Sequence, residues 1–193
     1  MEAPALLPGE IDSVGSRPPL RALLPEGRRL AIVGVCGVAL AVASFAVFGA
    51  SAHAVVGAVL CPTLVLLAVI DLRHRLLPNA VVLPSALLIA LLVAAFDAGD
   101  FFEHLWAGLA LFGFFFVFAV IFRGSLGVGD AKAGLLIGLA LGSRTLGAVM
   151  IAFFGLFIAA VWILVRHGLS ARRRSLPFGP FLAGGAILAF FFT

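Results

Sequence analysis

Charged side chains are scarce in this sequence: Asp, Glu, Lys and Arg make up only 11% of its 193 residues, whereas 63% are hydrophobic. An ordinary soluble domain is about one quarter charged and about half apolar, so this composition excludes that class. Several apolar runs approach or reach the roughly 20 residues needed to cross a hydrocarbon core about 30 Å thick. The sequence therefore predicts an all-α, polytopic integral membrane protein.

Cysteine and histidine are also rare. The two cysteines, Cys36 and Cys61, both lie in apolar runs, where a small hydrophobic side chain is explanation enough, and no CxxC motif is present. The four histidines are scattered without the spacing of metal ligands. They are His53, His74, His104 and His167. We expect no metal and no cofactor.

The amino-terminal end lacks the features of a signal peptide, because no basic region is followed closely by an apolar stretch. Residues 1–28 instead hold five of the ten prolines, carry both charge signs and show no sustained periodicity. We expect a loosely ordered cytoplasmic tail over 1–28 and a membrane-embedded domain over 29–193.

Seven apolar runs follow the tail, and segments exposed to lipid must be helical because lipid offers no partner for a free backbone group. The sequence predicts about seven transmembrane helices, within a range of six to eight. The runs are 30–50, 54–71, 80–96, 104–122, 130–142, 146–165 and 177–192.

Basic residues are distributed unevenly between the two ends of these helices. If the amino terminus is cytoplasmic, twelve of the thirteen Lys and Arg fall on that side and only Arg144 falls outside. This bias predicts an inward, cytoplasmic amino terminus, and we expect a multi-pass protein of the plasma membrane. It also explains the basic excess without a nucleic-acid partner. The twelve are Arg17, Arg21, Arg28, Arg29, Arg73, Arg75, Arg123, Lys132, Arg166, Arg172, Arg173 and Arg174.

Two aspartates are predicted to meet at the cytoplasmic edge. Asp71 ends the second helix and Asp130 begins the fifth, 59 positions later. Taken singly, Asp71 has a simple explanation as a juxtamembrane charge near Arg73 and Arg75, and Asp130 as a helix cap. Together they form the pair that aspartic proteolysis needs, in which one carboxyl group takes a proton from water and the other gives one to the scissile carbonyl.

Glycines surround Asp130 in the stretch GVGDAK, residues 127–132. Gly127 and Gly129 permit backbone angles closed to other residues and a close approach by another chain. We therefore expect a sharp turn that presents Asp130 at the membrane edge. A second set, Gly134, Gly138 and Gly142, recurs at every fourth position and predicts close helix packing.

Three ordered motifs resemble those of the type IV prepilin peptidases, which are membrane aspartic endopeptidases of the GxGD type. They are GVGDAK at 127–132, Asp71 followed by Leu77, Pro78 and Asn79, and LPFGPFLAGGA at 176–186. The resemblance implies that Asp71 and Asp130 are catalytic, with Gly127, Gly129, Lys132, Pro78 and Asn79 in support. It implies as substrates prepilins or pseudopilins of pilus and secretion systems, cut at the cytoplasmic edge after a short basic leader that usually ends in glycine.

Two roles remain open for Lys132: favouring the charged form of one carboxyl group, or pairing with a substrate carboxylate. Two also remain open for the third motif, whose members Pro177, Phe178, Gly179 and Pro180 either kink the entry to the last helix or form a substrate-facing loop.

The sequence departs from the long bifunctional members of that family, which carry paired CxxC motifs in an amino-terminal region. Methyltransferase activity is therefore not expected, and the chain resembles the compact, peptidase-only type. Besides the bilayer and the substrate, no partner is predicted, and the oligomeric state is open.

Two alternatives come from other classes of protein. One is an ion-coupled transporter that uses the same aspartates, although the internal repeats common in transporters are not seen. The other is a non-catalytic assembly factor of a pilus or secretion system, which the retention of both aspartates and of GVGD argues against.

Overall fold

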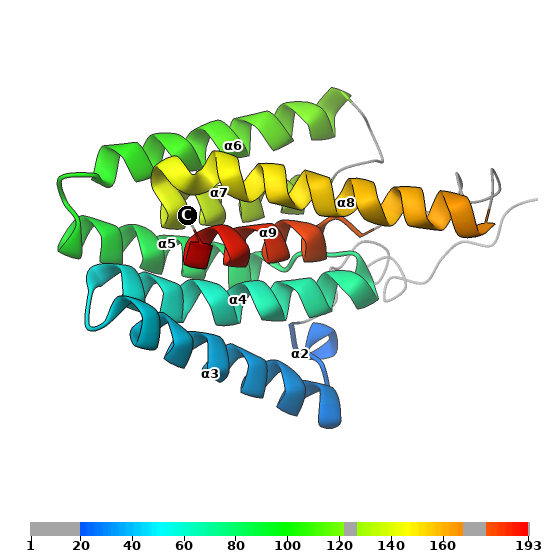
Figure 1. The fold of residues 1–193 in the computed structure, drawn as a ribbon, viewed down its shortest axis with the longest axis horizontal. Coiled ribbons are helices and arrows are strands. Elements are labelled where there is room, and N and C mark those ends of the chain that lie inside the picture. Colours follow the sequence, from blue (N-terminus) through cyan, green and yellow to red (C-terminus); the bar gives the residue numbers. More distant parts are fainter. Residues whose placement is uncertain (1–19, 122–126, 168–176, 193) are drawn as a thin grey trace, which may run out of the picture.

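The structure is a computed structural model and describes residues 20–121, 127–167 and 177–192. Within these ranges every regular element is helical, and the long helices run side by side in one bundle (Figure 1). The elements are α2 Leu20–Leu23, α3 Arg28–Phe48, α4 Ala52–His74, α5 Asn79–Phe96, α6 Phe101–Ile121, α7 Val128–Leu141, the short 3-10 helix η1 Gly142–Arg144, α8 Thr145–His167 and α9 Gly179–Phe192.

Each of the seven apolar runs corresponds to one helix from α3 to α9, so the all-helical prediction is confirmed. Five segments are long and apolar enough to cross a membrane: α3, α4, α5, α6 and the continuous stretch Val128–Arg166. The last of these contains both α7 and α8, and α9 is a shorter apolar helix. The architecture is that of a polytopic membrane protein, while the exact number of crossings stays a prediction.

Large apolar side chains cover the outside of the bundle, the reverse of a water-soluble protein. Exposed examples on α6 and α8 are Phe102, Trp106, Leu146, Phe154 and Val165. The interior combines alanine and glycine with leucine, isoleucine, valine and phenylalanine side chains, and in α7 nearly every residue from Ala131 to Leu141 is buried. Lipid tails are as apolar as these outer side chains, so the helices are held together by close packing and not by water exclusion.

Glycines bring α6 and α7 into backbone contact. A Cβ placed on Gly138 would lie 2.5 Å from both the Cα and the nitrogen of Gly108, and one on Gly134 would lie 2.9 Å from Phe115 Cδ2. Gly142 has a φ of +54° and ends α7, allowing the chain to turn into α8. The packing role predicted for the glycines at every fourth position is confirmed.

The tail is predicted to be loosely ordered, and its described end differs from that prediction; residues 1–19 lie outside the described residues. Residues 20–23 form the helical turn α2, with Leu23 buried. Pro25 is among the most completely buried side chains. The apolar side chains of this part of the tail thus pack against the end of the bundle, a contact that the mixed charge and proline content did not indicate.

The basic residues that the structure describes are arranged as the charge bias requires. Arg144 lies at the corner between α7 and α8, where its Nη1 is 2.8 Å from Nε2 of His53 in the first turn of α4. Arg73 and Arg75 lie at the other end of α4. Arg17, Arg123, Arg172, Arg173 and Arg174 lie outside the described residues. Arg144 is thus separated from Arg73 and Arg75 by the length of α4, while the direction of the bundle in the membrane stays a prediction.

Labelling of single cysteines tests that direction. In a chain lacking Cys36 and Cys61, we expect a membrane-impermeant maleimide to label the Asp100→Cys variant in intact spheroplasts. The His74→Cys variant should react only after permeabilisation. Both positions are exposed, on opposite ends of the bundle, so accessibility to the reagent decides the result. The reverse pattern would show that the orientation inferred from the charges is wrong.

Candidate active site

Asp71 lies near the end of α4 and is almost fully buried, with 6% of its surface exposed. Arg75, the residue that follows α4, caps the helix: it adopts the left-handed conformation with φ +52° and donates its backbone N–H to the carbonyl of Asp71. The side chain of Asp71 reaches across to the start of α9, where the N–H of Gly179 donates to Oδ2 at 3.0 Å. Two distant segments of the chain therefore hold this carboxyl group.

Asp130 lies in the first turn of α7 and is half-buried. The backbone N–H of Gly127 donates to its Oδ2 at 2.9 Å, which satisfies a donor that precedes the helix. Asp130 therefore caps α7, which is the simple role that the sequence suggested for this aspartate taken singly. The cap also restrains the carboxyl group of Asp130.

The backbone of GVGD differs from the prediction. Gly127 has a φ of −88°, and neither it nor Gly129 has a positive φ, so the sharp turn through unusual angles is wrong. The close approach is correct for Gly129, because a Cβ there would lie 3.0 Å from Cβ of Leu77. Glycine is needed at 129 for space between α7 and the segment that leads into α5.

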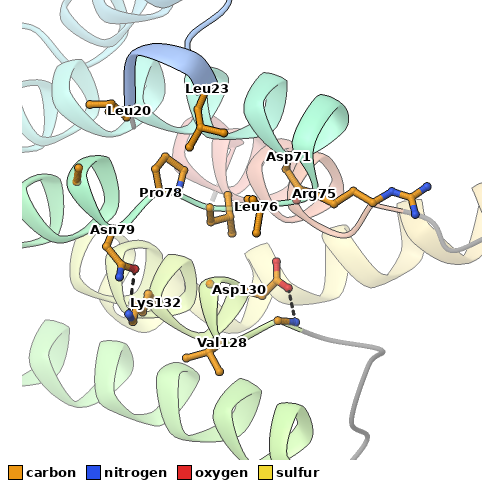
Figure 2. A pocket seen from close by; sticks show the side chains of 14 residues that line it. Leu20, Leu23, Asp71, Arg75, Leu76, Pro78, Asn79, Val128, Asp130 and Lys132 are labelled. Carbon is orange, nitrogen blue, oxygen red and sulfur yellow. Dashed lines mark hydrogen bonds between the residues drawn. The ribbon is translucent and has the colours of Figure 1, made fainter. Parts of the chain in front are cut away.

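Both aspartates line one pocket of about 410 Å³ at the end of the bundle. Figure 2 shows them on α4 and α7, across the pocket from each other. Among the described residues, the hydrogen bonds to the two carboxyl groups both use Oδ2, and Oδ1 of each aspartate accepts none. Both aspartates thus lie at one end of the bundle, as predicted, while their catalytic role stays a prediction.

The supporting residues also line this pocket. Lys132 Nζ donates to Oδ1 of Asn79 at 2.9 Å, which ties α7 to the first residue of α5. Pro78, in an extended conformation, directly precedes α5. The LPN and GVGDAK motifs therefore face each other across the pocket (Figure 2). Their roles in any reaction stay predictions.

The described part of the third motif, residues 177–186, lies beside the pocket, and none of these residues lines it. Phe178 is buried, with its ring 5.4 Å from that of Phe115 and 5.7 Å from that of Phe153. Gly179 contacts Asp71, and Pro180 lies in the first turn of α9. Phe178 thus has a packing role, while substrate contact by Pro177 or Pro180 stays a prediction.

Some residues that line the pocket were not predicted from the sequence to do so. Leu20 and Leu23 of α2 form part of the wall, and Arg75 lies at the end of α4 (Figure 2). Leu20 and Leu23 are three positions apart, the spacing that places two residues on one face of a helix. That spacing was the available signal, but a single turn is too short to stand out in a proline-rich tail.

Neither aspartate has metal-ligand companions in the described ranges. No group of three His, Cys, Asp or Glu side chains comes together within 20–121, 127–167 and 177–192. His53 contacts Arg144, and His104 Nδ1 lies 2.9 Å from the carbonyl of Leu139, both at the end of the bundle away from the aspartates. The chemistry that these residues offer is that of two carboxyl groups.

Comparison with known proteins places the chain in a family. Residues 58–164 match the model of the type IV leader peptidase family. The chain is 35% identical to the prepilin leader peptidase/N-methyltransferase of Bacillus subtilis (strain 168), over 75% of this chain and 58% of that protein. It is 30% identical to proteins of the same name from Burkholderia pseudomallei strains 1026b and K96243, over 87% of this chain and 56% of each.

The chain therefore spans a little over half the length of these relatives. No solved structure matches it. The family model covers more than half of the chain and includes both Asp71 and Asp130. By this match, and by the GVGDAK and LPN motifs that line one pocket, the chain belongs to the type IV leader peptidase family.

Proposed function

We propose that this protein is a membrane aspartic endopeptidase that removes the leader peptide from type IV prepilins or pseudopilins at the cytoplasmic edge of the plasma membrane. The observation that carries the proposal is the common pocket of Asp71 and Asp130, which come from different helices. Family membership and the names of the relatives support the class of reaction and of substrate.

The two carboxyl groups divide the work of adding water to a peptide bond. The ionised carboxyl group takes a proton from a water molecule as the oxygen of that water attacks the scissile carbonyl carbon. The protonated carboxyl group donates its proton to the carbonyl oxygen. The tetrahedral intermediate then collapses, the C–N bond breaks, and the leaving nitrogen takes a proton from the pair. The products are a new carboxyl end and a new amino end, with no other reactant consumed.

The contacts of both carboxyl groups favour this division. Each Oδ2 accepts one backbone N–H, from Gly179 for Asp71 and from Gly127 for Asp130, which restrains its position. Each Oδ1 stays available to water or substrate. Because two close carboxyl groups share protons as a unit, the acid and the base are roles of the pair and are not assigned to one residue each.

The walls of the pocket suit a substrate that has both polar and apolar parts. Lys132 and Asn79 offer donors and an acceptor on one side, and Leu20, Leu23 and Leu76 offer apolar surface. A leader peptide joined to an apolar helix presents both kinds of surface at the membrane edge. Lys132 is available to bind a peptide carbonyl or carboxylate there, since its Nζ retains donors beyond the one given to Asn79.

Cleavage by the reconstituted protein tests the proposal. We expect the full chain in liposomes to cut a prepilin-type substrate, with a short basic leader ending in glycine, immediately before its apolar helix. Mass spectrometry of the new amino terminus identifies the cut and shows whether a methyl group is added. Liposomes without the protein, and a substrate with the terminal leader glycine replaced by a bulky residue, serve as controls. A substrate left intact by well-inserted protein would contradict the proposed activity.

A further inference from the structure

Gly179 stands against the carboxyl group of Asp71 with no room between them. A Cβ placed on Gly179 would lie 2.6 Å from Oδ2, 2.9 Å from Cγ and 3.0 Å from Cβ of Asp71. The same residue donates its backbone N–H to Oδ2. Residue 179 thus limits the position of the Asp71 carboxyl group in two ways, by close contact and by a hydrogen bond. That carboxyl group belongs to the candidate pair.

The backbone at Gly179 is anchored more firmly than the side chain it faces. The ring of the preceding residue, Phe178, packs against Phe115 of α6 and Phe153 of α8. The carbonyl of Phe178 accepts the N–H groups of Phe181 and Leu182 in the first turn of α9. An added group at 179 would therefore push Oδ2 and Cγ of Asp71 aside, because the start of α9 is held by two other helices.

The other glycines of α9 have different surroundings, which separates positioning from packing. A Cβ on Gly184 would meet nothing within 4 Å. A Cβ on Gly185 would collide with the backbone of α8, at the carbonyl of Ala148 and at 2.7 Å from the nitrogen of Ala152. Of these three glycines, Gly179 is the one at which an added Cβ would collide with a carboxyl group.

From these contacts we infer that Gly179 is a positioning residue of the reaction: the start of α9 sets the place of the Asp71 carboxyl group relative to Asp130. Asp71 projects from α4, but its Oδ2 is held by α9, so the catalytic geometry depends on three helices, α4, α7 and α9. The inference rests on the proposed peptidase function and adds to it a residue that does not line the pocket.

A series of three alanine variants in the full chain tests this inference. For Gly179→Ala we expect kcat to fall by roughly 100-fold with KM within about 2-fold of wild type, because a misplacement near 1 Å of a reacting group has a cost of that size. Its thermal unfolding should stay close to that of the wild type, since turning the Asp71 side chain moves Oδ2 and Cγ away and leaves only the 3.0 Å contact to Cβ for a small shift to relieve. Its pH–rate profile should be displaced, because one of the groups that titrate has lost its hydrogen-bond geometry.

The two companion variants give the expected contrast. Gly184→Ala should match the wild type in kcat, pH profile and unfolding, and Gly185→Ala should unfold at lower temperature. Equal kcat for Gly179→Ala and Gly184→Ala would overturn the inference, as would a loss of activity in Gly179→Ala that is matched by a loss of folded protein. Wild-type protein that fails to cleave would instead refute the proposed function, so the two failures are distinguishable.

Discussion

Replacing either Asp71 or Asp130 with asparagine is expected to abolish cleavage of a prepilin-type substrate. Asparagine keeps the size of the side chain and can still accept from Gly179 or Gly127. It cannot exchange a proton with water or substrate, and general acid–base catalysis contributes about 100- to 10,000-fold to the rate. We expect each single variant to lose at least about 1,000-fold in kcat, measured by mass spectrometry of the substrate terminus.

The matched control for this pair is Asp100→Asn, at the other end of the bundle. Asp100 is exposed and lies in the turn between α5 and α6. This variant should cleave at the wild-type rate, and all three variants should be recovered from the membrane in similar amounts. Full activity of both Asp71→Asn and Asp130→Asn would rule out the two-carboxyl mechanism.

Gly138→Ala is expected to cause the largest loss of stability. A Cβ there would lie 2.5 Å from the Cα and nitrogen of Gly108 and 2.6 Å from the carbonyl oxygen of Ala107. These are backbone atoms of a packed helix, so α6 and α7 must separate to admit one methyl group. We expect a cost of about 3 kcal/mol, the upper part of the usual range for overpacking, seen as earlier thermal unfolding in detergent.

Gly113→Ala is the control for helix packing, since it adds the same group to α6 where nothing lies within 4 Å. It should unfold like the wild type. Gly138→Ala should also lose cleavage activity, because α7 carries Asp130. If Gly138→Ala unfolds with the same midpoint as Gly113→Ala, the close contact between α6 and α7 does not contribute to the stability of the bundle.

Part of the candidate site followed from the sequence because topology and local pattern were enough. The charge bias placed Asp71 and Asp130 at one edge, and the structure brings both into one pocket. The glycines at 134, 138 and 142 indicated a packing face from their spacing alone. The first inference needs only the alternating direction of successive helices across the membrane, and the second only the period of a single helix.

Other features could not be obtained in that way. The angles of GVGD were predicted wrongly, because glycine serves both for unusual angles and for close contact, and only the neighbour Leu77 shows which applies. The bond between Gly179 and Asp71 joins residues 108 positions apart, beyond the reach of any local pattern. The short α2 gave too few residues for a period to be recognised.

The sequence by itself determined the class of this protein: an all-helical membrane protein with two carboxyl groups expected at one edge. It could do so because hydropathy, charge bias and glycine spacing are properties of single segments in contact with lipid or water. The tertiary structure alone decided that the start of α9 holds the carboxyl group of Asp71. That contact depends on how several helices pack together, and packing at the scale of one methyl group is set by all of them at once.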